Sequence, residues 1–334
     1  MSATYRWIHK VWYDGAKSGL ILLPLSGLYW LILKCRELLF RYGAIRTYKA
    51  KVPVIVVGNI TAGGTGKTPT VIWLVNELRA KGYAPGIVSR GYGGSQSGTS
   101  MRVDADSDAS VVGDEPVLLA RRGRCPVVVD SDRVRATAML VEDGVNVIVA
   151  DDGLQHIRLH RDFEICVVDG KRMLGNGRLM PAGPLREPAR RLLSVDLTLV
   201  NGGDYSGATR FDVVATEAHR VNGSLVRPLS GSKGTTVHAV AGIGNPQRFF
   251  ELLREQGIQV IEHEFPDHAA MAVSDLQFGD EFEVFMTEKD AVKLDRKLPD
   301  KFWLIPVDLT MDDEQATALL ETIDSRLQSY GDKT

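Results

Sequence analysis

The chain has 334 residues, of which 44% are hydrophobic and 25% are charged, and its formal net charge is −2. These values are typical of globular proteins, and they exclude a disordered chain, a collagen-like chain and a polytopic membrane protein. The length predicts about two domains. Three widely separated cysteines without a Cys-x-x-Cys pair argue against a disulfide framework or a zinc site and favour a reducing compartment.

The first 51 residues are strongly basic and enclose an apolar run. They contain nine Lys or Arg residues and two acidic residues, while residues 18–33 carry no charge. A helix over 18–33 would be about 24 Å long, shorter than the ~30 Å hydrocarbon core of a bilayer. Because basic residues also follow the run directly, a signal peptide is not favoured. We predict a helix in the membrane interface, with a short spanning helix and a buried core helix as the alternatives.

Short apolar runs then alternate with helical stretches, a pattern that predicts an α/β fold with a parallel sheet. The clearest unit is a strand at 52–57 followed by a helix at 70–80. Two glycine-rich segments, 91–110 and 171–190, are predicted to be surface loops. Further strands are expected at 86–89, 127–129, 145–150, 163–168 and 197–200.

A β-hairpin is predicted to join this sheet to a smaller α/β domain. Asn222-Gly223 lies between two strand-like runs in 212–229, and this dipeptide favours a tight hairpin turn. The smaller domain is expected to contain a helix at 246–256 and strands at 237–241, 259–262, 284–287 and 303–307. We therefore expect a membrane-associated segment over 1–50, a P-loop core over 51–210, a hairpin linker over 211–230 and the smaller domain over 231–334.

The strand at 52–57 leads into a glycine-rich loop that ends in Gly66-Lys67-Thr68 and a helix, which is the context of a phosphate-binding P-loop. In such a loop backbone N–H groups surround phosphate oxygens, the lysine reaches the β- and γ-phosphates, and the threonine hydroxyl can bind Mg²⁺. Position 61 is usually glycine, so Gly63 and Gly64 are expected to supply the backbone freedom instead. The predicted nucleotide contacts are Thr61, Ala62, Gly63, Gly64, Thr65, Gly66, Lys67 and Thr68.

Two acidic residues follow another predicted strand. Asp151 and Asp152 come directly after 145–150, and ligands of α/β proteins bind at the carboxyl ends of strands. One carboxylate can therefore bind Mg²⁺ while the other orients a reacting group, and Asp169 is the rival magnesium ligand. The segment 242–247 lacks the last glycine of a dinucleotide fingerprint, and in 287–290 a Lys and an Asp are adjacent rather than separated, so neither predicts NAD or GTP binding.

A kinase that acts on an alcohol needs a group that accepts the hydroxyl proton. Asp114 and His268 are candidates for this role, and Arg90 could hold a substrate anion. Each residue also has a structural alternative, namely a helix cap for Asp114, a turn histidine for His268 and a solvated loop cation for Arg90. Spacing alone does not decide between these alternatives.

Ordered motifs over nearly the whole chain resemble the tetraacyldisaccharide 4′-kinases, the lipid A 4′-kinases of Gram-negative bacteria. Thr61 in the P-loop is usual in that family, while Ala269-Ala270 and 171–174 depart from its pattern and affect the substrate side rather than the reaction. Besides the apolar, basic N-terminal segment, the matching motifs are 56–61, 66–69, 89–94, 113–116, 151–156, 175–179, 181–187, 265–268 and 287–293.

The resemblance implies MgATP-dependent phosphorylation of the 4′-hydroxyl of a tetraacyl glucosamine disaccharide 1-phosphate, which gives lipid IVA. It implies a peripheral or monotopic enzyme at the cytoplasmic face of the bacterial inner membrane, in contact with anionic lipid. No nucleic acid and no obligate protein partner is expected. Two alternatives remain, namely a membrane-recruited P-loop ATPase that phosphorylates no acceptor, and a soluble small-molecule kinase whose N-terminal helix belongs to the core.

The resemblance also implies a role for each site residue. Asp114 and His268 would form the base pair, and Lys67 would neutralise charge on the transferred phosphoryl group. Asp151 and Thr68 would bind Mg²⁺. Asp152 would orient the nucleophile.

Overall fold

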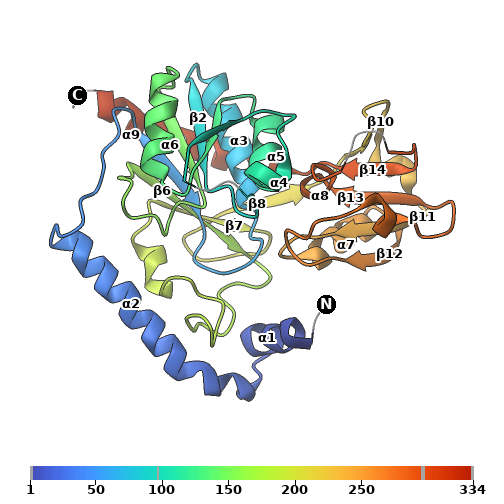
Figure 1. Ribbon diagram of the computed structural model, residues 1–334, viewed down its shortest axis with the longest axis horizontal. Coiled ribbons are helices and arrows are strands. Elements are labelled where there is room, and N and C mark those ends of the chain that lie inside the picture. Colours follow the sequence, from blue (N-terminus) through green and yellow to red (C-terminus); the bar gives the residue numbers. More distant parts are fainter. Residues whose placement is uncertain (1–2, 96–97, 295–297, 332–334) are drawn as a thin grey trace.

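The computed structural model describes residues 3–95, 98–294 and 298–331. Figure 1 shows a larger α/β body beside a smaller one, with a long N-terminal helix along the outer edge of the larger body. Within the described residues the strands form two sheets, one of nine strands and one of six. The predicted combination of a large and a small α/β unit is therefore present.

The larger sheet is mostly parallel. Its strand order is β15-β8-β7-β6-β1-β5-β2-β4-β3, and the outermost strands β15 and β3 run antiparallel to their neighbours. The central strands read as continuous apolar runs because helices or loops cover both faces. The strands are β15 (Asp308–Thr310), β8 (Thr209–Val214), β7 (Leu197–Asn201), β6 (Phe163–Asp169), β1 (Val54–Gly58), β5 (Val147–Asp151), β2 (Pro85–Ser89), β4 (Val127–Val129) and β3 (Met101–Val103).

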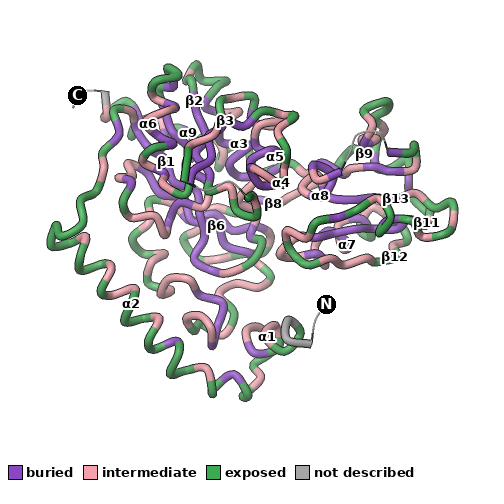
Figure 2. Tube along the Cα trace, viewed as in Figure 1, coloured by how far each residue is buried: buried purple, intermediate pink, exposed green. Residues whose placement is uncertain are grey.

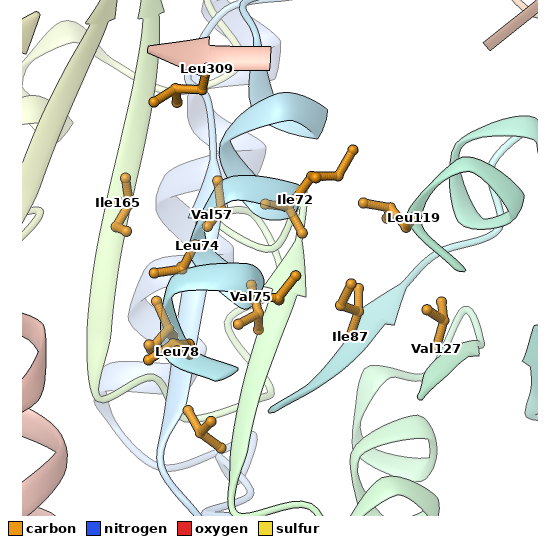
Figure 3. Close-up of a cluster of buried hydrophobic side chains, with 14 of the residues drawn as sticks. Val57, Ile72, Leu74, Val75, Leu78, Ile87, Leu119, Val127, Ile165 and Leu309 are labelled. Carbon is orange, nitrogen blue, oxygen red and sulfur yellow. The ribbon is translucent and has the colours of Figure 1, made fainter. Parts of the chain in front are cut away.

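Alternate residues of the central strands face two separate cores. Ile55 and Val57 of β1 face the core beneath α3, α5 and α9, while Val54 and Val56 face the core beneath α6 and the segments around Leu154 and Leu185. Figure 3 shows the first core, where α3 packs on the sheet. The helices of this body are α3 (Lys67–Ala80), α4 (Ala109–Val112), α5 (Asp114–Gly123), α6 (Arg133–Glu142), the 3-10 helix η2 (Ala189–Leu193) and α9 (Asp313–Gly331).

The smaller sheet has the order β10-β9-β14-β13-β11-β12. Strands β9 and β10 form the predicted hairpin around Asn222-Gly223, since His219 pairs with Val226 in antiparallel register. Helix α7 packs Phe249 on one face. The elements are β9 (Glu217–Arg220), β10 (Val226–Pro228), η3 (Leu229–Ser232), β11 (Thr236–Ala241), α7 (Pro246–Glu255), β12 (Gln259–Glu264), η4 (Val273–Leu276), β13 (Glu283–Thr287), α8 (Glu288–Ala291) and β14 (Phe302–Ile305).

Two features differ from the sequence-based expectations. The segment 91–110 was predicted to be a loop, yet it contributes β3 and the start of α4, because Met101–Val103 pairs with β4 at the sheet edge. The last residues were expected with the smaller domain, but β15 pairs with β8 and α9 contributes Leu319 and Ile323 to the core of the larger body. The predicted domain boundaries themselves stay a prediction.

The N-terminal arm is helical and largely exposed (Figure 2). It comprises α1 (Ala3–Tyr13), the 3-10 helix η1 (Lys17–Leu22) and α2 (Leu23–Arg41). Pro24 lies in the first turn of α2, where a missing N–H costs nothing, so it starts the helix rather than breaking it. By length and composition, the segment 17–41 could cross a membrane; its most apolar 18-residue window has a mean hydropathy of 1.6, and 11% of that window is buried. It is longer than the predicted run.

Candidate active site

A cleft of about 480 Å³ separates the two bodies. The larger body contributes the P-loop and the carboxyl ends of β2 and β5, and the smaller body contributes residues that follow β11, β12 and β13. Side chains from positions far apart in the sequence therefore face one another across it. The cleft is lined by every predicted site residue except Thr61, Asp114 and the rival magnesium ligand Asp169.

The P-loop connects β1 to α3, as predicted. Gly66 precedes α3 with φ of 105°, a left-handed conformation that favours glycine, and a Cβ there would lie 2.5 Å from Asn201 Nδ2. That nitrogen donates a hydrogen bond to the Thr65 carbonyl at 3.0 Å. The N-terminus of α3 thus faces the cleft with free N–H groups, an arrangement that binds phosphate. Lys67 and Thr68, the first residues of α3, line the cleft.

Thr61 does not need the conformation that glycine would supply. It is buried, it forms an isolated bridge with Leu185, and the next N–H, of Ala62, donates to the Pro184 carbonyl at 2.8 Å. The backbone freedom comes instead from Gly63, whose φ is 105°, while Gly64 has no positive φ. The segment 171–190 therefore holds the start of the P-loop.

Asp151 and Asp152 lie at the end of β5, on the floor of the cleft. Asp151 is buried and accepts a hydrogen bond from Ser89 Oγ at 3.0 Å. Burial raises the pKa of Asp151 to about 7, and the carboxylates of Glu115 and Asp152 add to the rise. The Asp151 carboxylate therefore lies where a negative charge is unfavourable unless a cation is near.

The pKa of Asp152 is shifted in the opposite direction, below its ordinary value. Its Oδ1 lies 3.7 Å from Lys67 Nζ and 2.9 Å from an Arg186 guanidinium nitrogen. Burial alone would raise the pKa of Asp152, but Lys67 and Arg186 outweigh burial and lower it. Two carboxylates adjacent in sequence thus differ in character, and their different neighbours are the cause.

Asp114 and His268 are brought together although 154 positions separate them. His268 Nδ1 lies 3.0 Å and 3.2 Å from the two carboxylate oxygens of Asp114, and Tyr92 packs against the imidazole edge-on. Burial alone would raise the pKa of Asp114, but His268, Lys289 and Lys293 outweigh burial and lower it. The carboxylate is therefore ionised at neutral pH and can accept a proton.

The two remaining candidates, Asp169 and Arg90, differ in their position relative to the cleft. Asp169 is buried outside the cleft, where it accepts hydrogen bonds from the N–H groups of Lys171 and Arg172 at 2.9 Å and 3.0 Å, so it is a turn cap rather than a magnesium ligand. Arg90 is exposed and lines the cleft. Sequence reasoning did not single out Arg186 or Lys289, although both lie in motifs that carried the family resemblance.

The residues present fit a magnesium ion without forming a closed metal cage. Within residues 3–95, 98–294 and 298–331, no three His, Cys, Asp or Glu side chains converge as a metal site. Mg²⁺ bound with a nucleotide usually takes one or two carboxylates, phosphate oxygens and water, so a full set of protein ligands is not required. Asp151 and Thr68 both face the cleft, and the crowding of negative charge at Asp151 would be relieved by a divalent cation.

The strand, loop and helix around Lys67 define an α/β protein of the P-loop class. A family model described as LpxK, tetraacyldisaccharide-1-P 4′-kinase, matches residues 18–327. A tetraacyldisaccharide 4′-kinase of Nitrosococcus oceani is 48% identical over 305 residues, covering 91% of this chain and 90% of the relative. A second, of Methylobacillus flagellatus, is 45% identical and covers 98% of each chain. The chain therefore belongs to the tetraacyldisaccharide-1-phosphate 4′-kinase family.

A solved structure extends this result to the fold. The crystal structure of LpxK from Aquifex aeolicus in complex with ATP has a TM-score of 0.77 and 29% sequence identity, and the match covers 92% of this chain and 99% of that one. The family, the P-loop fold and the kinase activity predicted from the sequence are confirmed. The individual roles of the site residues stay predictions.

Proposed function

We propose that the chain transfers the γ-phosphoryl group of MgATP to the 4′-hydroxyl of a tetraacyldisaccharide 1-phosphate at a membrane surface, giving lipid IVA. The observation that carries the proposal is that His268, which contacts the buried Asp114 of the opposite body at 3.0 Å, lines the same cleft as Lys67 of the P-loop. A P-loop ATPase that only switches partners has no need of a base for an alcohol.

The phosphate side of the reaction is assigned to the P-loop. The backbone of 61–68 and the N-terminus of α3 would bind the phosphates, and Lys67 would offset charge on the phosphoryl group as it moves. Asp151 and Thr68 would hold Mg²⁺, which supplies neutralisation of phosphate charge when bound. Asp152, held by Lys67 and Arg186, would orient the reacting groups without carrying the ion.

The acceptor side is assigned to Asp114 and His268. The ionised Asp114 carboxylate would take the proton of the 4′-hydroxyl as its oxygen attacks phosphorus. His268 would hold this carboxylate in place through Nδ1. Asp114→Asn replaces the carboxylate by an uncharged amide, which cannot take the proton. This variant is expected to lower kcat about 100-fold or more and to leave ATP binding nearly unchanged.

Membrane contact is supported by the exposed apolar surface of the N-terminal arm. Leu25, Leu28, Leu31 and Ile32 of α2 are each more than half exposed. Basic residues flank this surface, and an apolar helix with basic flanks favours an anionic lipid interface. A peripheral or monotopic position at the cytoplasmic face of the inner membrane is the arrangement that delivers a lipid acceptor and cytosolic ATP to one cleft.

The experiment uses γ-labelled MgATP and a tetraacyldisaccharide 1-phosphate in detergent micelles, with Lys67→Ala and Asp114→Asn as parallel variants. Label in the lipid that both variants lose supports the proposal. ATP hydrolysis that depends on membranes but never labels the lipid contradicts it. Full lipid labelling by Asp114→Asn removes that residue from the assigned chemistry.

A further inference from the structure

Two lysines of the segment 287–293, Lys289 and Lys293, lie against the Asp114–His268 pair. Lys289 Nζ lies 3.3 Å from His268 Nε2, 3.1 Å from Glu115 Oε1 and 3.1 Å from Asp267 Oδ1. An ammonium group has three protons and no lone pair, so three acceptors surround three donors. For the 3.3 Å contact to be a hydrogen bond, His268 Nε2 has to accept, because the ammonium group can only donate.

This contact fixes which ring nitrogen carries the proton. With Nε2 as the acceptor, the proton of the neutral ring sits on Nδ1, the atom that faces Asp114 at 3.0 Å. Burial alone would lower the pKa of Lys289, but Glu115 and Asp267 outweigh burial and raise it, so the donor stays charged. Lys289 therefore turns His268 into a dedicated donor to the carboxylate.

Lys293 acts on the other member of the pair. Its Nζ lies 3.4 Å from Asp114 Oδ2 and 2.9 Å from Asp290 Oδ1. Asp290 is fully buried and accepts hydrogen bonds from the Gly242 N–H and the Thr287 hydroxyl, at 2.9 Å and 2.6 Å. The lysine is thus anchored in the smaller body and presents its charge to a carboxylate on the larger body.

We propose that the segment 287–293 positions the proposed base pair, with Lys289 fixing the tautomer of His268 and Lys293 holding Asp114 as a carboxylate. The inference rests on the proposed function, and both lysines are positioning residues. The ionisable groups that face the pair come from every element packed around it; they are Tyr92, Glu115, Asp267, Lys289 and Lys293.

The first test reads the tautomer directly. In full-length protein labelled with ¹⁵N-histidine, the His268 signals are assigned among seven histidines by their loss in His268→Gln. At neutral pH the wild type is expected to show a proton on Nδ1 and a bare Nε2. Lys289→Gln, a neutral N–H donor, should keep that tautomer, whereas Lys289→Met should lose it and lower kcat about 10- to 100-fold with ATP KM within threefold. A proton on Nε2 in the wild type would overturn the assignment.

The second test reads the charge at Asp114. In Lys293→Met, the lower apparent pKa in the pH profile of kcat/KM should rise by about one to two pH units. Lys293→Arg should keep the wild-type profile. Because Lys293→Met leaves Asp290 buried without its partner, Asp290→Asn/Lys293→Met is made beside it and must show the same shift. Lys301→Met, which removes a lysine bonded to the Asp280 carbonyl, is the matched control. An unmoved acid limb in the double variant would refute the role of Lys293.

Different results would contradict the proposed function and the positioning role of the two lysines. ATP hydrolysis without lipid labelling in the wild type would contradict the proposed function, and full activity in Asp114→Asn would contradict the proposed base. An inactive Asp114→Asn together with wild-type behaviour of Lys289→Met and Lys293→Met would contradict only the positioning role of the two lysines.

Discussion

Replacing Asp151 by asparagine is expected to make the protein more stable while it removes a proposed magnesium ligand. The carboxyl is buried on the floor of the cleft, and burial together with Glu115 and Asp152 raises its pKa to about 7. Its unfolded pKa is near 4, so between about pH 4 and pH 7 the folded state binds a proton that the unfolded state has released. The stability that this carboxyl contributes in its protonated form is therefore lost as the pH rises through this window.

The magnitude follows from the pKa difference. Each unit is worth about 1.4 kcal/mol, so roughly three units set an upper limit of about 4 kcal/mol at pH 7 and above. Asparagine has no charge to bury and can still accept the hydrogen bond of Ser89. The stabilisation from Asp151→Asn should consequently be smallest near pH 4 to 5 and reach about 1 to 4 kcal/mol at pH 8.

The assay is chemical denaturation of both proteins at pH 5 and pH 8 in a chelator, then again with excess MgATP. We expect the advantage of the variant to grow with pH, and MgATP to stabilise the wild type more than the variant. Asp169→Asn is the matched control: an asparagine oxygen can still accept from the two N–H groups, but the ion pair with Arg248 is lost, so this variant should not be more stable than the wild type at pH 8. Equal stability of Asp151→Asn and wild type at pH 8 would refute the electrostatic reasoning.

Two further substitutions test the loop and the arm. Gly66→Ala should cost about 1 to 3 kcal/mol in a denaturation assay and abolish ATP binding, because its φ is 105° and its Cβ would lie 2.5 Å from an asparagine nitrogen of β7. Gly144→Ala, at φ of 85° with open space around it, should cost less, and equal costs would exclude the steric argument. Leu28→Asp/Ile32→Asp should abolish sedimentation with anionic vesicles, whereas Leu193→Asp at a surface site 89% exposed should not; sedimentation of both variants alike would contradict membrane contact through α2.

The parts predictable from sequence are those that local spacing determines. The strand, loop and helix from 52 to 80 follow from an apolar run, a glycine cluster and Gly66-Lys67-Thr68, which are contiguous. The hairpin at Asn222-Gly223 likewise needs only its own residues. The return of β15 to the larger sheet was not predicted, since three residues at a sheet edge carry no periodicity that names their partner.

Contacts across the cleft could not be predicted from the sequence for the same reason. Nothing local tells that His268 meets Asp114, or that Lys289 meets both His268 and Glu115 from positions more than 20 and 170 residues away. Both motifs were recognised only as parts of a family pattern. The structure adds the 3.0 Å contact between His268 and Asp114, on which the proposed base pair rests.

One loop links the exposed helix to the chemistry of the cleft. Ser26 of α2 donates to the Leu179 carbonyl at 2.9 Å, and the Tyr29 hydroxyl donates to the Arg186 carbonyl at 2.9 Å. The side chain of Arg186 in turn contacts Asp152 at 2.9 Å. A displacement of α2 relative to the larger body would therefore move the arginine that opposes the Asp152 charge. On the proposed membrane placement, the surface that would meet lipid and the carboxylate proposed to orient the reacting groups are two ends of one short path of hydrogen bonds through Arg186.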